Sequence, residues 1–341
     1  MTQCRNSLFT LLGPALSYKC KLSPTVQLHL WRTYSLPVLT SGLSALPIRP
    51  AVMKTLQIFQ NKILRGFLKL SNSSPVPSLY FLCGELPIEA RLHLDLLSLF
   101  FNIWSNPQTT IFTIVLYIMK MAGEKSTTWS FHLRLICQLY ALPDPLELMQ
   151  QPAMSKSAWK TLVTTRVTAY HEAQLRQIAL KNSNLTYLNV QLLGLNGRPH
   201  PAILNIAETR EAFKLRAHLK FLTGDFLSFS PLSTSGESEL PRCRLCAASF
   251  ECTQHILTEC RCTSNVRDRL FPELLNLLAD IQPTCDILVH GIPNSLLTQF
   301  ILDPTSMNLP NSCRISILHP RLHELYRLSR DWCYAVSRCK S

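Results

Sequence analysis

The segment PRCRLCAASFECTQHILTECRC, residues 241–262, is the most informative stretch of the chain. Cys243 and Cys246 are two residues apart, His255 follows after eight more and Cys260 after four more, which gives the pattern C-x2-C-x8-H-x4-C. Zinc prefers four thiolate or imidazole ligands arranged as a tetrahedron. The spacing therefore predicts a Zn²⁺ site with Cys243, Cys246, His255 and Cys260 as ligands. Four protein ligands leave no open position for water, so the expected role is structural.

Two further cysteines leave the ligand set open at this stage. Cys252 or Cys262 could replace Cys260 or His255, and a plain alternative is that all of these residues are ordinary reduced cysteines. The segment has few bulky apolar side chains of its own. Metal binding would therefore supply much of its folding free energy.

Composition predicts the surroundings of this segment. The chain has 341 residues, 47% of them hydrophobic, with only 10 glycines but 22 prolines, which fits helices separated by prolines better than a glycine-rich nucleotide fold. The predicted fold is mainly α, a multi-helix array with a small Cys/His zinc-binding segment near the C-terminus. We divide it into a helical region at 1–105, a basic helical middle at 106–230, a zinc-binding domain at 231–270 and a helical tail at 271–341.

Hydrophobic periodicity locates the individual helices. Pro37 should end the first of them, because the residue before a proline avoids the helical region. The apolar run at 109–119 fits either a helix or a strand, and it is shorter than the roughly 20 residues that a membrane span needs. We expect helices near 23–36, 50–70, 88–104, 129–142, 155–181, 205–222, 266–281 and 319–338. His218 in the helix at 205–222 and Arg330 in the helix at 319–338 are expected at the surface. Glu208 and Glu211 are expected to form ion pairs within their own helix.

Positive charge is unevenly distributed along the chain. The formal net charge is +13, and residues 1–84 contain nine Lys and Arg but no Asp or Glu. Such a stretch suits a polyanion, and phosphate backbones of RNA or DNA are the usual one. The alternative is an ordinary solvated face. The candidate contacts lie opposite the apolar stripe of the helix at 50–70 and along the helix at 205–222: Lys54, Lys62, Arg65, Lys69, Arg210 and Lys214.

Cysteine usage and motif content limit the function classes. The 13 cysteines have no disulfide-scaffold rhythm and no secretory signal opens the chain, so we expect an intracellular protein of the nucleus or cytoplasm. Adjacent acidic residues, a phosphate-binding glycine loop, a nucleophile elbow and an H-E-x-x-H motif are all missing from the sequence. These absences disfavour an enzyme acting alone, and neither a small-molecule substrate nor a membrane is expected as a partner.

Several stretches, taken in order, resemble the C-terminal region of reverse transcriptases from non-LTR (LINE-type) retrotransposons. Residues 31–43, WRTYSLPVLTSGL, are similar to the family's helix beyond the polymerase palm, and residues 56–65, LQIFQNKILR, to the thumb helix that follows. Residues 84–88, GELPI, match a recurrent turn. Residues 222–225, LTGD, followed by the Cys/His pattern, are similar to the zinc-binding domain that closes these proteins.

The resemblance implies a thumb-like region at 1–105 and a nucleic-acid- and zinc-binding fragment without polymerase chemistry. In the family, the palm with its paired aspartates lies upstream of these stretches. Three positions depart from the pattern: Ser41 and Ser44 replace a tyrosine and an acidic residue, and Asp225 replaces a frequent histidine. The alternative function is a zinc-stapled protein-interaction module without a nucleic-acid role, which the acidic residues around the motif favour.

Overall fold

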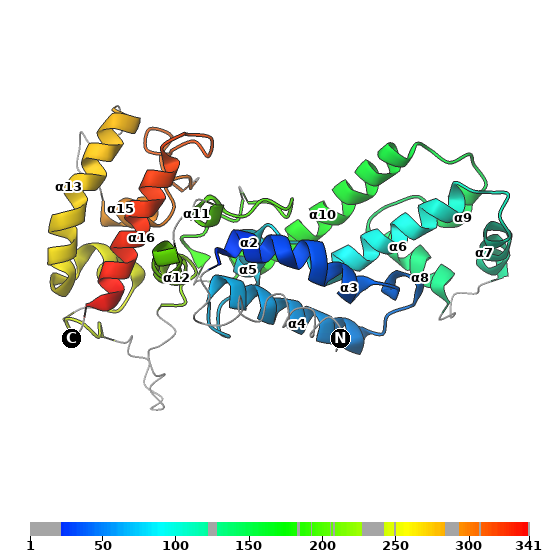
Figure 1. The fold of residues 1–341 in the computed structure, drawn as a ribbon, viewed down its shortest axis with the longest axis horizontal. Coiled ribbons are helices and arrows are strands. Elements are labelled where there is room, and N and C mark those ends of the chain that lie inside the picture. Colours follow the sequence, from blue (N-terminus) through cyan, green and yellow to red (C-terminus); the bar gives the residue numbers. More distant parts are fainter. Residues whose placement is uncertain are drawn as a thin grey trace.

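The computed structural model describes residues 22–121, 128–182, 185–191, 193–204, 206, 209–226, 242–248, 250–283, 293–306 and 308–339. Across these residues the fold is mainly helical, as predicted, and the only β-type pairing among them is an isolated bridge between Arg242 and Phe250. Figure 1 shows two groups of helices along the long axis, with α2–α10 on one side and α12–α16 on the other. The division into domains at 1–105, 106–230, 231–270 and 271–341 stays a prediction.

The chain's first described helix runs through Pro37, so the predicted end before this proline is wrong. α2 (Pro24–Leu30) begins at Ser23, whose hydroxyl accepts a hydrogen bond from Val26 N–H, and continues through a π-helical turn at Trp31–Ser35 into α3 (Leu36–Thr40). A π turn is wider than an α turn because each N–H bonds the carbonyl five residues back. The widening makes room for the proline ring, which would clash with the preceding turn of a regular α-helix.

Most of the other predicted helices are confirmed with small shifts of their ends. Thr128 caps α8 and Ser155 caps α10 through their hydroxyl groups. The ambiguous run at 109–119 is the helix α7. The bounds are α4 (Pro50–Leu68), α5 (Val76–Cys83), α6 (Ile88–Trp104), α7 (Thr110–Met121), α8 (Trp129–Leu139), α9 (Pro145–Met149), α10 (Lys156–Leu180), α11 (Pro201–Leu204), α12 (Thr209–Leu222), α13 (Ser264–Ile281), α15 (Asn294–Leu302) and α16 (Leu322–Arg338).

The first group of helices packs around α6 and α10. Phe100, Phe101 and Trp104 of α6 surround Trp159 of α10, with ring centroids about 6 Å apart. The indole N–H of Trp159 donates to the Leu97 carbonyl at 3.1 Å. The large aromatic side chains therefore bury their apolar surface while the one polar atom keeps a partner.

A buried glutamine organises the turn between α5 and α6. Gln60 of α4 donates to the Leu86 carbonyl at 2.9 Å and accepts from the Ile88 N–H at 2.7 Å. It thereby satisfies an orphan donor at the start of α6. Gly84 in the same turn has φ +62°, and the Arg198 carbonyl oxygen would lie 2.2 Å from any Cβ added there. The segment around Arg198 therefore crosses the turn at a distance that only glycine permits.

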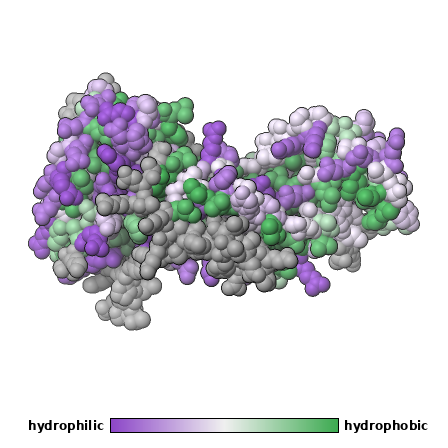
Figure 2. All heavy atoms as spheres, in the orientation of Figure 1, coloured by the Kyte–Doolittle hydropathy of each residue, from purple (hydrophilic) through white to green (hydrophobic). Residues whose placement is uncertain are grey.

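α7 carries an exposed apolar face. Ile111, Ile114, Tyr117 and Met121 are 51–69% exposed, and Figure 2 shows hydrophobic side chains gathered over this helix. Through the described parts of the chain, no helix combines the length and the hydropathy that a membrane crossing requires.

The second group of helices buries polar side chains that were predicted to lie at the surface. His218, predicted to lie at the surface, is fully buried, and its Nε2 lies 2.7 Å from the Leu302 carbonyl oxygen. Arg330, predicted to be exposed, is 1% exposed and pairs with Glu211, which was expected to pair within its own helix. Both errors arise because a single-helix pattern cannot show that α12 is covered by α16 on this face.

Candidate metal centre

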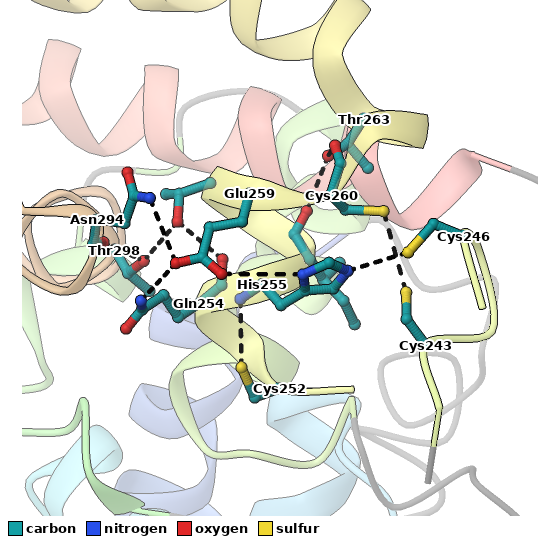
Figure 3. A network of polar contacts seen from close by, with 12 residues as sticks. Cys243, Cys246, Cys252, Gln254, His255, Glu259, Cys260, Thr263, Asn294 and Thr298 are labelled. Atoms are coloured by element: carbon teal, nitrogen blue, oxygen red, sulfur yellow. Dashed lines mark hydrogen bonds and ion pairs between the residues drawn. The ribbon is translucent and has the colours of Figure 1, made fainter. Parts of the chain in front are cut away.

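The four residues of the Cys/His pattern lie together in one buried cluster. Each of Cys243, Cys246, His255 and Cys260 offers a ligand atom, and all four atoms lie within 4.8 Å of one another. Cys243 Sγ is 4.0 Å from Cys260 Sγ, and Cys246 Sγ is 3.3 Å from His255 Nε2 (Figure 3). The sulfur–sulfur distance is far longer than the roughly 2.05 Å of a disulfide bond. The cluster could therefore hold a metal ion.

The first two ligands come from a tight knuckle. The Ala247 N–H donates to the Cys243 carbonyl at 2.8 Å, and Ala247 has φ +56°. A left-handed conformation is uncommon outside glycine, and here it reverses the chain directly after Cys246. The bridge between Arg242 and Phe250 closes the base of the loop. The knuckle thus turns two sulfur atoms toward one point.

The other two ligands flank a π-helical turn, His255–Glu259. The Cys260 N–H donates to the His255 carbonyl at 2.6 Å. In a regular α-helix, residues three and four apart share a face, whereas residues five apart diverge. The wider π turn places Cys260 over His255 and so brings an imidazole and a thiol with x4 spacing to the same side. Single π turns recur at functional sites.

Polar side chains lie behind the histidine ring. Nδ1 of His255 lies 3.9 Å from a carboxylate oxygen of Glu259. Glu259 is itself held by Gln254 at 2.6 Å and by Asn294 of α15 at 3.3 Å (Figure 3). A carboxylate that accepts a hydrogen bond from a histidine N–H would fix the ring orientation, but the 3.9 Å separation is longer than such a bond. The cluster thus has an outer layer of polar side chains as well as four candidate ligands.

The thiols differ in their readiness to ionise. A hydrogen bond from the backbone of Ala248, followed by contacts with His255 and the other thiols, lowers the pKa of Cys246 to about 6. Burial raises the pKa of Cys260 to about 12. Cys246 thus loses its proton more readily than Cys260, which needs a cation beside it before it becomes a thiolate at neutral pH.

The two spare cysteines lie outside the cluster of four facing ligand atoms. Cys252 is exposed, and its sulfur accepts a hydrogen bond from the His255 N–H at 3.3 Å. Cys262 is also exposed and lies 3.1 Å from the Leu245 carbonyl oxygen. Neither side chain joins the four ligand atoms that face one another.

The cluster is built into the second group of helices. The Trp332 indole N–H of α16 donates to the Leu257 carbonyl at 3.3 Å. Thr258 and Thr298 of α15 lie hydroxyl to hydroxyl at 3.2 Å, and both are buried. Sequence spacing predicted the four residues of the cluster but not these anchors, because the anchors come from residues 40 to 75 positions further along the chain.

The candidate phosphate contacts differ in their exposure and in their partners. On α4, Lys54 and Lys62 are exposed, whereas Arg65 is half-buried and donates to the Ser74 carbonyl at 2.9 Å. Lys69 caps the C-terminal end of α4 with a left-handed backbone. On α12, Lys214 pairs with Asp331 of α16. The side chain of Arg210 lies outside the described residues.

A further polar cluster was not foreseen from the sequence. Asp303, fully buried, accepts hydrogen bonds from Thr305 at 2.6 Å and from the Tyr326 hydroxyl at 2.9 Å. His200 Nε2 lies 3.5 Å from its other oxygen, and these contacts hold the pKa of Asp303 below its usual value even though burial opposes this. Thr305 is only two residues from Asp303, but His200 and Tyr326 come from other parts of the chain, so a local motif does not predict the cluster. No protein-family model, curated protein or solved structure matches the chain.

Proposed function

We propose that the Cys/His cluster holds Zn²⁺ as a structural ion. A tetrahedron with Zn–S bonds of about 2.3 Å has sulfur atoms about 3.8 Å apart, and the Cys243–Cys260 distance of 4.0 Å lies close to this value. Three thiols and an imidazole are ligands that suit zinc, whereas magnesium and calcium prefer oxygen ligands. The cluster is buried, so the ion would hold the knuckle against α15 and α16 without reacting.

We further propose that the chain binds nucleic-acid backbones, as a fragment of a non-LTR retrotransposon reverse transcriptase that lacks the polymerase palm. The observation that carries this proposal is the acid-free start of the chain together with the exposure of Lys54 and Lys62 on α4. A surface rich in cations and without carboxylates of its own attracts phosphates without reading base sequence. The retroelement origin rests on the ordered sequence resemblance.

Binding to labelled duplex DNA and RNA between 50 and 300 mM NaCl tests this function. Affinity should fall steeply with salt because each neutralised phosphate releases counterions. The double variant Lys54→Gln/Lys62→Gln should reduce the slope of log affinity against log salt by about 2 for duplex DNA. The matched control, Lys120→Gln/Arg269→Gln, removes two exposed cations from α7 and α13 and should change the slope less. Salt-independent affinity would contradict the proposal.

A zinc-stapled protein-interaction module is the second candidate. The exposed apolar face of α7, with Ile111, Ile114, Tyr117 and Met121, favours it, because contiguous apolar patches on soluble proteins often mark contact sites. The acidic residues near the motif favour it less, since Glu251 pairs with Arg244 and Glu259 lies beside His255. If no polynucleotide binds at 50 mM NaCl, the protein-interaction module is the only one of the two candidate functions that remains.

A further inference from the structure

An open groove of about 370 Å³ lies between α12 and the last turns of α16, beside the metal knuckle. α12 contributes Arg216 and Lys220 to its lining, α16 contributes Tyr334 and Arg338, and the knuckle contributes Arg244. α12 and α16 pack directly on each other, next to the segment that holds the cluster (Figure 1). None of these residues was among the phosphate contacts expected from the sequence.

The groove is positively charged. Arg216, Lys220, Arg244 and Arg338 line it, and no carboxylate does so among the described residues. Glu251 binds Arg244 from outside the lining. Burial lowers the pKa of Lys220 and the nearby Arg216 lowers it further, while Asp225 opposes both effects. Cations that crowd together in a hollow with apolar walls produce a strong local attraction for anions.

Aromatic side chains line the same groove as these cations. The Phe226 ring stacks on Phe221 with centroids 4.0 Å apart, and the Arg244 guanidinium carbon lies 4.9 Å from the Phe226 centroid on the groove side. Phe213 and Tyr334, which also line the groove, are 49% and 36% exposed. Exposed rings beside cations are the arrangement on which successive bases stack while their phosphates follow the positive charge.

We propose that this groove binds a single strand of nucleic acid, with bases on Tyr334 and Phe213 and phosphates at Arg216, Lys220 and Arg338. The inference rests on the proposed nucleic-acid function. It adds the binding site on the protein and the preference for a single strand over a duplex. Duplex bases are already stacked on one another, so exposed rings in a groove select an unpaired strand. Arg244 lies between two candidate metal ligands in the sequence, so the ion also positions one wall of the groove.

The test uses the full zinc-loaded chain and the anisotropy of fluorescein-labelled oligo(U) and oligo(dT), each about 12 nucleotides long. Tyr334→Leu should weaken binding roughly 10-fold, because it removes one stacking platform, whereas Tyr334→Phe should stay within about twofold. Arg338→Gln should lower the salt slope by about 0.7. Tyr117→Leu on α7, which removes a tyrosine that is 64% exposed elsewhere, is the matched control. Comparison of the two oligonucleotides shows whether RNA or DNA is preferred.

The outcomes separate this inference from the function on which it rests. If Lys54→Gln/Lys62→Gln weakens duplex binding while Tyr334→Leu binds both oligonucleotides as wild type does, the proposed single-strand site in the groove is overturned. The proposed binding of nucleic-acid backbones then still stands. Displacement of labelled oligo(U) by polyglutamate as effectively as by unlabelled oligo(U) would identify an acidic-peptide site and also overturn it. If no polynucleotide binds at 50 mM NaCl, both proposals fail. Thermal unfolding of each variant excludes loss of fold as the cause.

Discussion

Glu211 of α12 and Arg330 of α16 form a buried ion pair, with Oε2 and Nη2 2.5 Å apart. The Arg330 side chain is 1% exposed and that of Glu211 14% exposed. Arg330 also donates to the Ala202 carbonyl at 3.4 Å, so one guanidinium joins α16 to α12 and to α11. Burial lowers the pKa of Arg330, and the Glu211 carboxylate opposes this effect.

Removal of one partner of this pair should be strongly destabilising. Glu211→Gln removes the carboxylate that pairs with this buried guanidinium, and breaking a buried ion pair typically costs about 3–5 kcal/mol of unfolding free energy. Arg327→Gln, on an exposed position of the same helix α16, should stay within about 0.5 kcal/mol of wild type. Urea unfolding at pH 7 measures both values. Equal stability of the two variants would mean that the pair does not hold the helices together.

Two glycines with left-handed backbone allow a matched test of the turn before α6. Gly84 has φ +62° and Gly42 has φ +74°, but only at Gly84 would an added Cβ meet another segment, with Arg198 O at 2.2 Å. Gly42→Ala should therefore cost about 1 kcal/mol from backbone strain alone. Gly84→Ala adds displacement of the Arg198 segment and should cost at least about 2 kcal/mol more. Similar losses for both variants in thermal unfolding would exclude the close approach.

Local chemistry explains which features the sequence predicted well. The spacing of Cys243, Cys246, His255 and Cys260 depends on one short segment, so a pattern of residues was enough to name the cluster. Helix α4 followed from its periodicity for the same reason. Pro37 was misjudged because a π turn leaves no signal in the sequence.

Features that depend on distant parts of the chain could not be predicted. The burial of His218 and Arg330 results from the packing of α12 on α16, more than 100 residues later in the sequence. The groove beside the knuckle is likewise assembled from two helices and a loop. Helical periodicity distinguishes the two faces of one helix, but it does not say which polar face another helix will cover.

Buried neutral histidines should make the protein sensitive to acid. Burial lowers the pKa of His218 to about 4, with the Leu302 carbonyl opposing and Arg330 adding to the effect. Between about pH 6.5 and pH 4 the unfolded chain then binds a proton that the folded chain does not, so stability falls as pH falls. At pH 4 the loss from His218 is on the order of 3 kcal/mol.

The variant His218→Gln isolates this contribution, because an amide can still donate to the Leu302 carbonyl but does not titrate. Its unfolding free energy should decrease less than that of wild type as pH is lowered from 6.5 to 4. Taking the difference between the two proteins at each pH cancels any loss of metal that both share. His323→Gln, at an exposed position, should remain within about 0.5 kcal/mol of wild type. A constant difference between His218→Gln and wild type across this range would refute the prediction.

The spare cysteines provide internal controls for the metal centre. Cys260→Ala removes a buried ligand, whereas Cys252→Ala removes an exposed thiol three residues before His255. We expect one zinc per chain in wild type and in Cys252→Ala, and much less in Cys260→Ala, when metal content is measured on protein purified without added chelator.

Loss of the ion should also loosen the packing around the knuckle. Structural zinc contributes roughly 10 kcal/mol or more to the folding of small metal domains, and here the segment has α15 and α16 as additional support. Cys260→Ala and chelated wild type should therefore show the same lowered midpoint of thermal unfolding, and chelator should not lower that of Cys260→Ala further. Amide exchange should become faster first at residues 242–248 and 250–263, before α16 is affected, because these residues carry the four side chains that the ion would hold together. Full metal content in Cys260→Ala, or an unfolding midpoint that chelation of wild type leaves unchanged, would show that the four side chains gather without an ion.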